Sequence, residues 1–324
     1  MTTETETLTL APRTVFGETL VELADRYPDF LLLDGDLANS TRADILNNAR
    51  PDRFLEMGIA EQNLIGVAAG LATVGFVPWV SSFAAFIASR DLDQIRVVVA
   101  QPGLNVKLAG GYSGLLTGST GKTHQEVEDL AIFRAMPHMT VVAPADGVEV
   151  RAAMWALMEH HGPAYLRLTR DPSPVVTPRD RPFEIGRAYL LREGADVTLI
   201  ATGVQTTRAL EAAELLAAEG VEAHVLHMPT LKPLDEEAIV AAAARTGRVV
   251  TAEDHSIIGG LGGAVAETLG ERRPTPMRRV GLRDVFGESG PNAPLLEKYG
   301  LTPAHMAQAA RNLIGATPRI AISH

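Results

Sequence analysis

Two runs of one alternating pattern, separated by a proline-rich stretch, constrain this chain more than any other feature of its sequence. In each run, short segments rich in Leu and β-branched residues alternate with longer segments that have helical spacing. The first run predicts strands at 30–34, 77–80, 104–108, 140–143 and 164–168, and helices at 61–72, 91–100 and 148–160. Such alternation is typical of α/β folds with a mainly parallel sheet flanked by helices.

The second run shows the same alternation of strand-like and helix-like segments. It predicts strands at 197–201, 223–227 and 248–251, helices at 207–219 and 235–244, and a further helix after the glycine-rich turn 258–264. Between the runs, the segment DPSPVVTPRDRPF (171–183) has too many prolines to pack as a regular element. We therefore expect a flexible tail (1–11), a first α/β domain (12–170), a linker (171–186) and a second α/β domain (187–324).

Composition excludes several classes of function. Lys and Arg number 29 against 39 Asp and Glu, and the net charge of −10 argues against binding nucleic acid or anionic lipid through bulk electrostatics. The absence of cysteine excludes disulfides, thiolate zinc sites and cysteine nucleophiles. The polar start MTTETETLTLAP is unlike an export signal, and runs such as VTLIATGV are too short to cross a bilayer. We expect a cytoplasmic protein that binds neither nucleic acid nor membrane.

The segment EMGIAEQNLIGVAAGLA (56–72) places Glu61 at the head of an otherwise apolar helix rich in Gly and Ala. A glutamate in the first turn is also favoured by the helix dipole alone, so the residue type does not decide its role. Small residues at Gly66, Ala69 and Gly70 would permit another helix or chain to approach closely. This combination predicts a buried subunit interface beside Glu61.

Two further segments carry side chains suited to ligand binding. Phe83 and Phe86 are spaced i, i+3 in a chain that is only 5% aromatic, a spacing found in cores as well as in platforms for flat rings. The segment AGGYSGLLTGSTGKTHQ (109–125) holds five glycines, which let the backbone approach a ligand closely. It ends at His124, which is suited to acid–base work near neutral pH or to a structural hydrogen bond.

In this order and with these spacings, the three segments resemble the pyrimidine-binding domain of the transketolase family. GIAEQN is similar to the family's catalytic-glutamate motif, SFAAF to its pyrimidine-stacking motif and GKTHQ to its substrate-side histidine loop. The second run resembles the family's C-terminal domain at TAEDH (251–255), GGLGG (259–263) and FGESG (286–290). The resemblance covers roughly residues 12–315 and implies an enzyme that depends on thiamine diphosphate.

The resemblance implies a role for each motif residue. Glu61 would hydrogen-bond a ring nitrogen of the cofactor's aminopyrimidine and so support removal of the proton at the thiazolium C2 atom. Phe86 would stack on the pyrimidine with Phe83 beside it, and Asp36 would contact the cofactor. His124 would contact a hydroxyl or carbonyl oxygen of the sugar. Glu61 and His124 are thus the expected catalytic residues.

The substrate end of the site follows the family less closely. Arg13, Ser40 and Arg170 lie where the family binds the far phosphate of sugar phosphates, a task that suits the bidentate guanidinium group. Tyr112 stands where the family usually has His, and Thr120 where it usually has Asp. Both departures concern the substrate and neither concerns the cofactor. The resemblance therefore implies the chemistry more firmly than a pentose-phosphate substrate.

Half of a full-length transketolase has no counterpart in this sequence. The family's first domain binds the diphosphate and its metal through Gly-Asp-Gly and a later Asn. The nearest segment here, Asp34-Gly35-Asp36, has the wrong order, and Asn47-Asn48 follows too closely. The resemblance implies a split enzyme in which a separate N-terminal subunit holds Mg²⁺ or Ca²⁺, with this chain binding no metal. We expect a heterotetramer of two subunits of each kind, acting on sugar-phosphate-like substrates.

Other interpretations stay open on the sequence. The beta subunit of a 2-oxo acid dehydrogenase shares both domains, but LEKYGLTP (296–303) favours transketolase. Deoxyxylulose-phosphate synthase is a third relative, whose halves are normally fused. A non-catalytic assembly or regulatory partner would have no reason to keep Glu61, Phe86 and His124 together. The donor sugar, the acceptor sugar and the pathway are not determined by the sequence.

Overall fold

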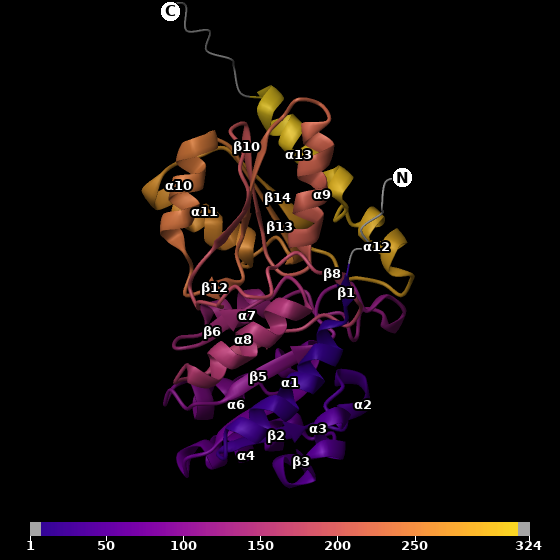
Figure 1. Cartoon of the computed structure of the whole chain (residues 1–324), viewed down its shortest axis with the longest axis vertical. Coiled ribbons are helices and arrows are strands. Elements are labelled where there is room, and N and C mark those ends of the chain that lie inside the picture. The colour runs from indigo at the N-terminus through magenta and orange to yellow at the C-terminus, as the bar shows by residue number, and fades with distance from the viewer. Residues whose placement is uncertain (1–7, 317–324) are drawn as a thin grey trace, which may run out of the picture.

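The computed structural model describes residues 8–316 as two α/β domains packed end to end along the long axis (Figure 1). The first domain contains a seven-stranded sheet in the order β12-β6-β7-β5-β4-β2-β3, parallel except for β12. The strands are β2 (Phe30–Asp34), β3 (Phe54–Glu56), β4 (Val77–Phe83), β5 (Lys107–Gly111), β6 (Thr140–Val142), β7 (Ala164–Arg167) and β12 (Thr230–Lys232). The two-domain α/β fold predicted from the alternating pattern is confirmed.

Helices cover both faces of this sheet because each strand buries side chains on both sides. Leu32 packs with Phe16 and Trp79 on the face covered by α1 and α8, whereas Leu33 packs with Leu64 on the face of α4. The helical elements of the first domain are α1 (Pro12–Arg26), α2 (Ala38–Thr41), α3 (Asp44–Ala49), η1 (Pro51–Arg53), α4 (Glu61–Thr73), α5 (Ala84–Ile87), α6 (Leu92–Gln94), η2 (Ile95–Ala100), η3 (Gly118–Thr120), α7 (Asp129–Ala135) and α8 (Gly147–Glu159).

The second domain contains a five-stranded sheet in the order β14-β13-β10-β11-β9, parallel except for β9. Its strands are β9 (Tyr189–Arg192), β10 (Val197–Ala201), β11 (Ala223–His227), β13 (Val249–Ser256) and β14 (Met277–Leu282). Its helices are α9 (Gln205–Ala217), α10 (Glu236–Thr246), α11 (Leu261–Arg272), α12 (Asn292–Lys298) and α13 (Pro303–Ala316). Within residues 8–316, no helix is long and apolar enough to cross a membrane.

Two predicted elements of the first domain differ in detail. The strand predicted at 104–108 lies at Lys107–Gly111, because pairing with β4 and β7 sets its bounds. The helix predicted at 91–100 is a short α-helix that continues as the π-helical turn η2. Periodicity in the sequence cannot distinguish these helical geometries over so few residues.

The predictions of a loose tail and an irregular linker are wrong where the two meet. Thr9 and Leu10 form β1, which pairs antiparallel with β8 (Ser173–Pro174) inside the linker. The Asp146 side chain then holds the next linker residues, accepting from the backbone N–H groups of Val176 and Thr177 at 2.7 and 2.8 Å. Residues 1–7 of the expected tail lie outside the described residues.

The two domains are joined by both backbone and side chains. β12 belongs to the second half of the chain but pairs with β6 of the first sheet. The buried Arg167 donates to Asp129 Oδ2 at 2.8 Å and to the carbonyl oxygen of Asp254 in β13 at 2.9 Å. These contacts fix the second domain against the loops that follow the first sheet.

Candidate active site

The predicted site residues gather at one edge of the first sheet, where neighbouring parallel strands end. Asp36 follows β2, Phe83 closes β4, Tyr112 follows β5 and Arg170 lies three residues beyond β7. Ligands of open parallel sheets bind outside this carboxyl edge. The topology thus brings together segments that are far apart in the sequence.

Glu61 is the first residue of α4, and its side chain is 6% exposed. The turn before it is tied to the loop after β2 by Glu56, whose Oε1 accepts from the N–H groups of Asp36 and Gly58 at 2.9 and 2.8 Å. One oxygen of Glu61 accepts from Nη1 of Arg90 at 2.8 Å. The fold therefore places a buried carboxylate at the start of a helix, where the dipole favours its charge.

An aromatic cluster lies beside this carboxylate. Phe83 and Phe86 have ring centroids 5.6 Å apart, and His124 meets both rings edge-on at 5.7 and 5.5 Å. The His124 Nδ1 atom shares a hydrogen bond of 2.8 Å with the Thr123 hydroxyl. The half-exposed histidine thus holds its ring beside Phe86, and its expected catalytic role stays a prediction.

Tyr112 joins the aromatic cluster to two arginines. Its ring stacks on Phe83 with centroids 4.1 Å apart. Its hydroxyl accepts from Arg170 Nε at 3.1 Å and from Arg13 Nη1 at 3.3 Å. Tyr112 has a left-handed backbone with φ of +58°, which turns its side chain into this position. Two guanidinium groups therefore converge on one phenol, whose O–H group can donate to a further acceptor.

Ser40 and Thr120 contribute less directly. The carbonyl oxygen of Ser40 accepts from Arg13 Nη1 at 3.1 Å, while its hydroxyl donates to Asn39. The Thr120 hydroxyl is bonded to Thr117 Oγ1 at 2.6 Å and so is partly used within its own loop. Asp36 is exposed and reaches this region through its backbone. The structure thus groups Arg13, Tyr112 and Arg170. The side chains of Ser40, Thr120 and Asp36 lie at the margin of this group.

The loop that carries Thr120 is held by the second domain. Gly118 has φ of +36°, and a Cβ atom there would lie 2.5 Å from the carbonyl oxygen of Gly290. Gln125 donates to the carbonyl oxygen of Glu288 at 3.1 Å. The FGESG segment therefore packs directly on the substrate-side loop, and glycine is required at position 118.

An open face of α4 runs beside Glu61. Gly66 and Gly70 lie on this face, where a Cβ atom added to either glycine would meet no other atom within 4 Å. Ile59 and Val74 at the ends of the face are 74% and 72% exposed. Ala69 is buried in the core of its own domain and does not lie on this open face. The open face combines small and apolar residues, as an interface between subunits would.

These residues fit one half of a thiamine diphosphate site. A buried carboxylate, a phenylalanine platform and a half-exposed histidine suit an aminopyrimidine ring and the carbonyl group of a sugar. Among residues 8–316, no group of three or more His, Cys, Asp or Glu could hold a metal ion. A diphosphate and its cation need several oxygen ligands and backbone donors. The residues of this edge fit the pyrimidine half of such a site.

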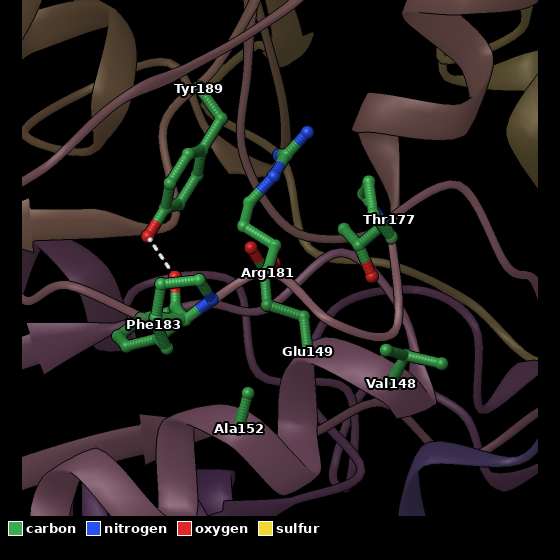
Figure 2. Close-up of a pocket in the computed structure, with 9 residues that line it drawn as sticks. Val148, Glu149, Ala152, Thr177, Arg181, Phe183 and Tyr189 are labelled. Carbon is green, nitrogen blue, oxygen red and sulfur yellow. Dashed lines mark hydrogen bonds between the residues drawn. The ribbon is translucent and has the colours of Figure 1, made fainter.

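Several hollows lie near the junction of the domains. A groove of about 470 Å³ opens beside Arg170, between Thr117 and Ser119 on one side and Ser289 and Asn292 on the other. A smaller hollow, about 10 Å³, lies where the linker crosses α8, and Figure 2 shows Glu149, Arg181 and Tyr189 among the side chains that line it. It holds at most a single water molecule. Of these two, the groove borders the predicted substrate residue Arg170.

Two polar residues of the site were missed as candidates in the sequence. Arg90 pairs with Glu61, and Asp91 beside it is fully buried, with no hydrogen-bond partner for either carboxylate oxygen among the described residues. Burial raises the pKa of Asp91 to about 8, and the negative charge of Glu61 adds to this shift. Arg90 and Asp91 lie four and five residues after Phe86, and this spacing could have indicated that they belong to the site. A charged pair before a helix, however, usually indicates a solvated surface.

Family models agree with the geometry of this site. The model of the transketolase pyrimidine-binding domain matches residues 9–174, and that of the transketolase C-terminal domain matches residues 186–306. The chain therefore belongs to the transketolase family. Within this family it is a subunit of the split kind, which carries these two domains.

Individual relatives differ in how much of their own length this chain covers. A 6-deoxy-6-sulfo-D-fructose transketolase subunit of Clostridium sp. is 45% identical over 93% of this chain and 94% of its own length. Human transketolase is 37% identical over 94% of this chain but only 49% of its own length. A solved structure described as a split gene transketolase, inactive beta4 tetramer, superimposes with a TM-score of 0.89 at 48% identity and covers 95% of this chain and 100% of its own.

Proposed function

We propose that this chain is the pyrimidine-side subunit of a thiamine-diphosphate-dependent transketolase. The enzyme would transfer a two-carbon ketol unit from an anionic ketose to an aldose. The observation that carries this proposal is the buried Glu61 carboxylate beside Phe86, at the edge where Tyr112, Arg13 and Arg170 also converge. When bound, the cofactor would supply the nucleophilic carbon that attacks the ketose carbonyl.

The chain's own residues would then bind and orient. Glu61 would hydrogen-bond a ring nitrogen of the aminopyrimidine, since a poorly hydrated carboxylate forms a strong hydrogen bond. Phe86 would stack on that ring, and Phe83 would support both Phe86 and Tyr112. His124 would contact the sugar oxygen next to the reacting carbon. Asp36 would complete the cofactor side of the loop after β2.

A separate N-terminal subunit would complete the site. The described residues hold no metal cluster, and the chain matches only half of human transketolase. The solved relative that is a tetramer of beta chains is described as inactive, which supports a need for a second kind of subunit. The face of α4 around Gly66 and Gly70 would receive this partner. We propose a heterotetramer, two of each subunit, in which the partner holds Mg²⁺ or Ca²⁺.

Mixing experiments test the partner requirement. We expect the purified chain to show no transketolase activity and no Mg²⁺-dependent binding of thiamine diphosphate in calorimetry. Adding a candidate N-terminal subunit should restore both, with a mass in light scattering that fits two copies of each chain. Tight metal-dependent binding of the cofactor by this chain alone would contradict the proposal. Pyruvate-dependent acyl transfer to lipoamide by the mixture would instead support a 2-oxo acid dehydrogenase.

The substrate end favours an anionic ketose other than the common pentose phosphates. Arg13 and Arg170 place two positive charges beside the Tyr112 hydroxyl, and such a phenol donates a neutral hydrogen bond to an anion. The relative in Clostridium sp. is named for a sulfonated ketose. We therefore propose a substrate with a terminal phosphate or sulfonate, whose hydroxyl pattern suits Thr120 rather than a carboxylate.

Exchange of these two residues tests the preference. The double variant Tyr112→His, Thr120→Asp should raise kcat/KM for xylulose 5-phosphate and ribose 5-phosphate by about tenfold for each residue. A charge-assisted hydrogen bond contributes about 1.5–3 kcal/mol, against about 1 kcal/mol for a neutral one. Tyr112→Phe, which keeps the ring on Phe83, is the matched control and should gain nothing. A wild-type kcat/KM for these phosphates above about 10⁴ M⁻¹s⁻¹ would show that both residues are neutral.

A further inference from the structure

The guanidinium group of Arg90 lies over the ring of Phe86, the side chain proposed above to stack on the cofactor. Its Cζ atom is 3.8 Å from the centroid of the Phe86 ring. Its Nη1 atom donates to Glu61 Oε1 at 2.8 Å. One flat, hydrogen-bonding group therefore contacts both the aromatic platform and the buried carboxylate at once.

An aminopyrimidine would make the same two contacts. It is also planar, it stacks on an aromatic face, and its protonated ring nitrogen can donate to a carboxylate. A stacked group at 3.8 Å fills the van der Waals space above the ring, so Arg90 and the aminopyrimidine cannot lie there together. The Phe83 and His124 rings, which also contact Phe86, belong to the aromatic cluster.

We propose that Arg90 holds the place of the aminopyrimidine ring in the chain before assembly and leaves it when the cofactor binds. This inference rests on the proposed function, since it takes Glu61 and Phe86 as the pyrimidine site. It makes Arg90 a residue that sets the affinity for the cofactor.

The surroundings of Arg90 suit a side chain that moves on a fixed backbone. Its carbonyl oxygen accepts from Gln62 Nε2 at 2.9 Å, and its N–H donates to the carbonyl oxygen of Phe86 at 2.8 Å. Its side chain is 47% exposed, whereas that of Glu61 is 6% exposed. The guanidinium can therefore return to water at little cost, while a buried carboxylate needs a partner at all times. Arg90 provides that partner until the cofactor does.

Removing the charge of Arg90 should thus strengthen cofactor binding. In the complex with the N-terminal subunit, Arg90→Met keeps a long apolar stem but removes the competitor. We expect its Kd for thiamine diphosphate with Mg²⁺, measured by calorimetry, to fall about tenfold. Arg90→Lys keeps the charge without the flat group, and its Kd should lie between those of wild type and Arg90→Met. Arg278→Met, an exposed arginine of β14, is the matched control and should not change the Kd.

The isolated chain gives a second measurement that needs no partner. We expect 4-amino-5-hydroxymethyl-2-methylpyrimidine at millimolar concentration to raise the Tm of the Arg90→Met chain but not that of wild type. If the wild-type complex binds the cofactor and the Kd of the Arg90→Met complex is unchanged or higher, this inference alone is overturned. A higher Kd would mean that Arg90 is a ligand of the cofactor. A wild-type complex that binds no thiamine diphosphate would overturn the proposed function itself.

Discussion

Glu61→Gln should slow hydrogen–deuterium exchange at C2 of bound thiamine diphosphate by about 10²–10⁴-fold, the usual contribution of a positioned acid or base. The amide keeps the size of the side chain and can still form a hydrogen bond. It lacks the negative charge that would favour the protonated aminopyrimidine. The Glu61 side chain is 6% exposed, so bulk water does not replace the lost charge. Exchange is measured by acid quench and proton NMR in the reconstituted complex, and kcat should fall with it.

A matched control separates this role from helix stabilisation. Glu236 is also the first residue of its helix, α10, and is also paired with an arginine, Arg272, at 3.4 Å. Glu236→Gln should cost only a few tenths of a kcal/mol in stability, as helix-dipole contacts at exposed sites do, and should leave C2 exchange unchanged. If Glu61→Gln behaved in the same way, Glu61 would be a helix-start residue and nothing more.

The sequence was sufficient for the fold and for the grouping of most site residues. Alternating segments predicted parallel sheets, and parallel sheets place every motif that follows a strand at the same edge. That rule brings Phe83, Tyr112 and Arg170 together, since β4, β5 and β7 are neighbours. The order of strands itself was not predictable, because pairing between distant segments depends on the whole core. The crossing of β12 into the first sheet is one such result.

Side-chain contacts across the site could not be predicted from spacing. The hydrogen bonds of Tyr112 with Arg13 and Arg170 join three segments far apart in the chain, and they depend on the left-handed backbone at Tyr112. The surroundings of the small residues near the site could not be predicted from spacing either. Gly66 and Gly70 face open space, whereas Ala69 faces the core, because one helix presents neighbouring residues to different surroundings.

Asp91 shows the physical cost of this arrangement most directly. Its carboxyl group is fully buried and its oxygens have no hydrogen-bond partner among the described residues. Burial raises its pKa from 3.8 to about 8, with a further contribution from the negative charge of Glu61, while Arg90 acts in the opposite direction. The folded protein therefore favours the neutral acid, whereas the unfolded chain ionises with an ordinary pKa.

The sign of the pH dependence follows from linkage. Because the folded pKa lies above the unfolded one, the folded state binds more protons, and the free energy of unfolding falls as the pH rises from about 4 to about 8. The asparagine in Asp91→Asn has the same shape as the aspartic acid and cannot ionise. The free energy of unfolding of this variant therefore does not fall with pH for this reason. We expect the difference in unfolding free energy between Asp91→Asn and wild type to grow by about 3 kcal/mol between pH 5.5 and pH 8.5, at about 1.4 kcal/mol for each pH unit of the window.

Urea denaturation of the isolated chain at a series of pH values measures this difference. Asp93→Asn is the matched control, since Asp93 lies two residues further along in α6 and is exposed. Its curve should run parallel to that of wild type at every pH, because an exposed carboxylate is in contact with water in both the folded and the unfolded chain. Parallel curves for Asp91→Asn as well would mean that the Asp91 carboxyl group is hydrated in the folded chain. The expected divergence would instead show that the segment carrying Arg90 beside Glu61 is held in place at the expense of stability, a cost that active sites commonly carry.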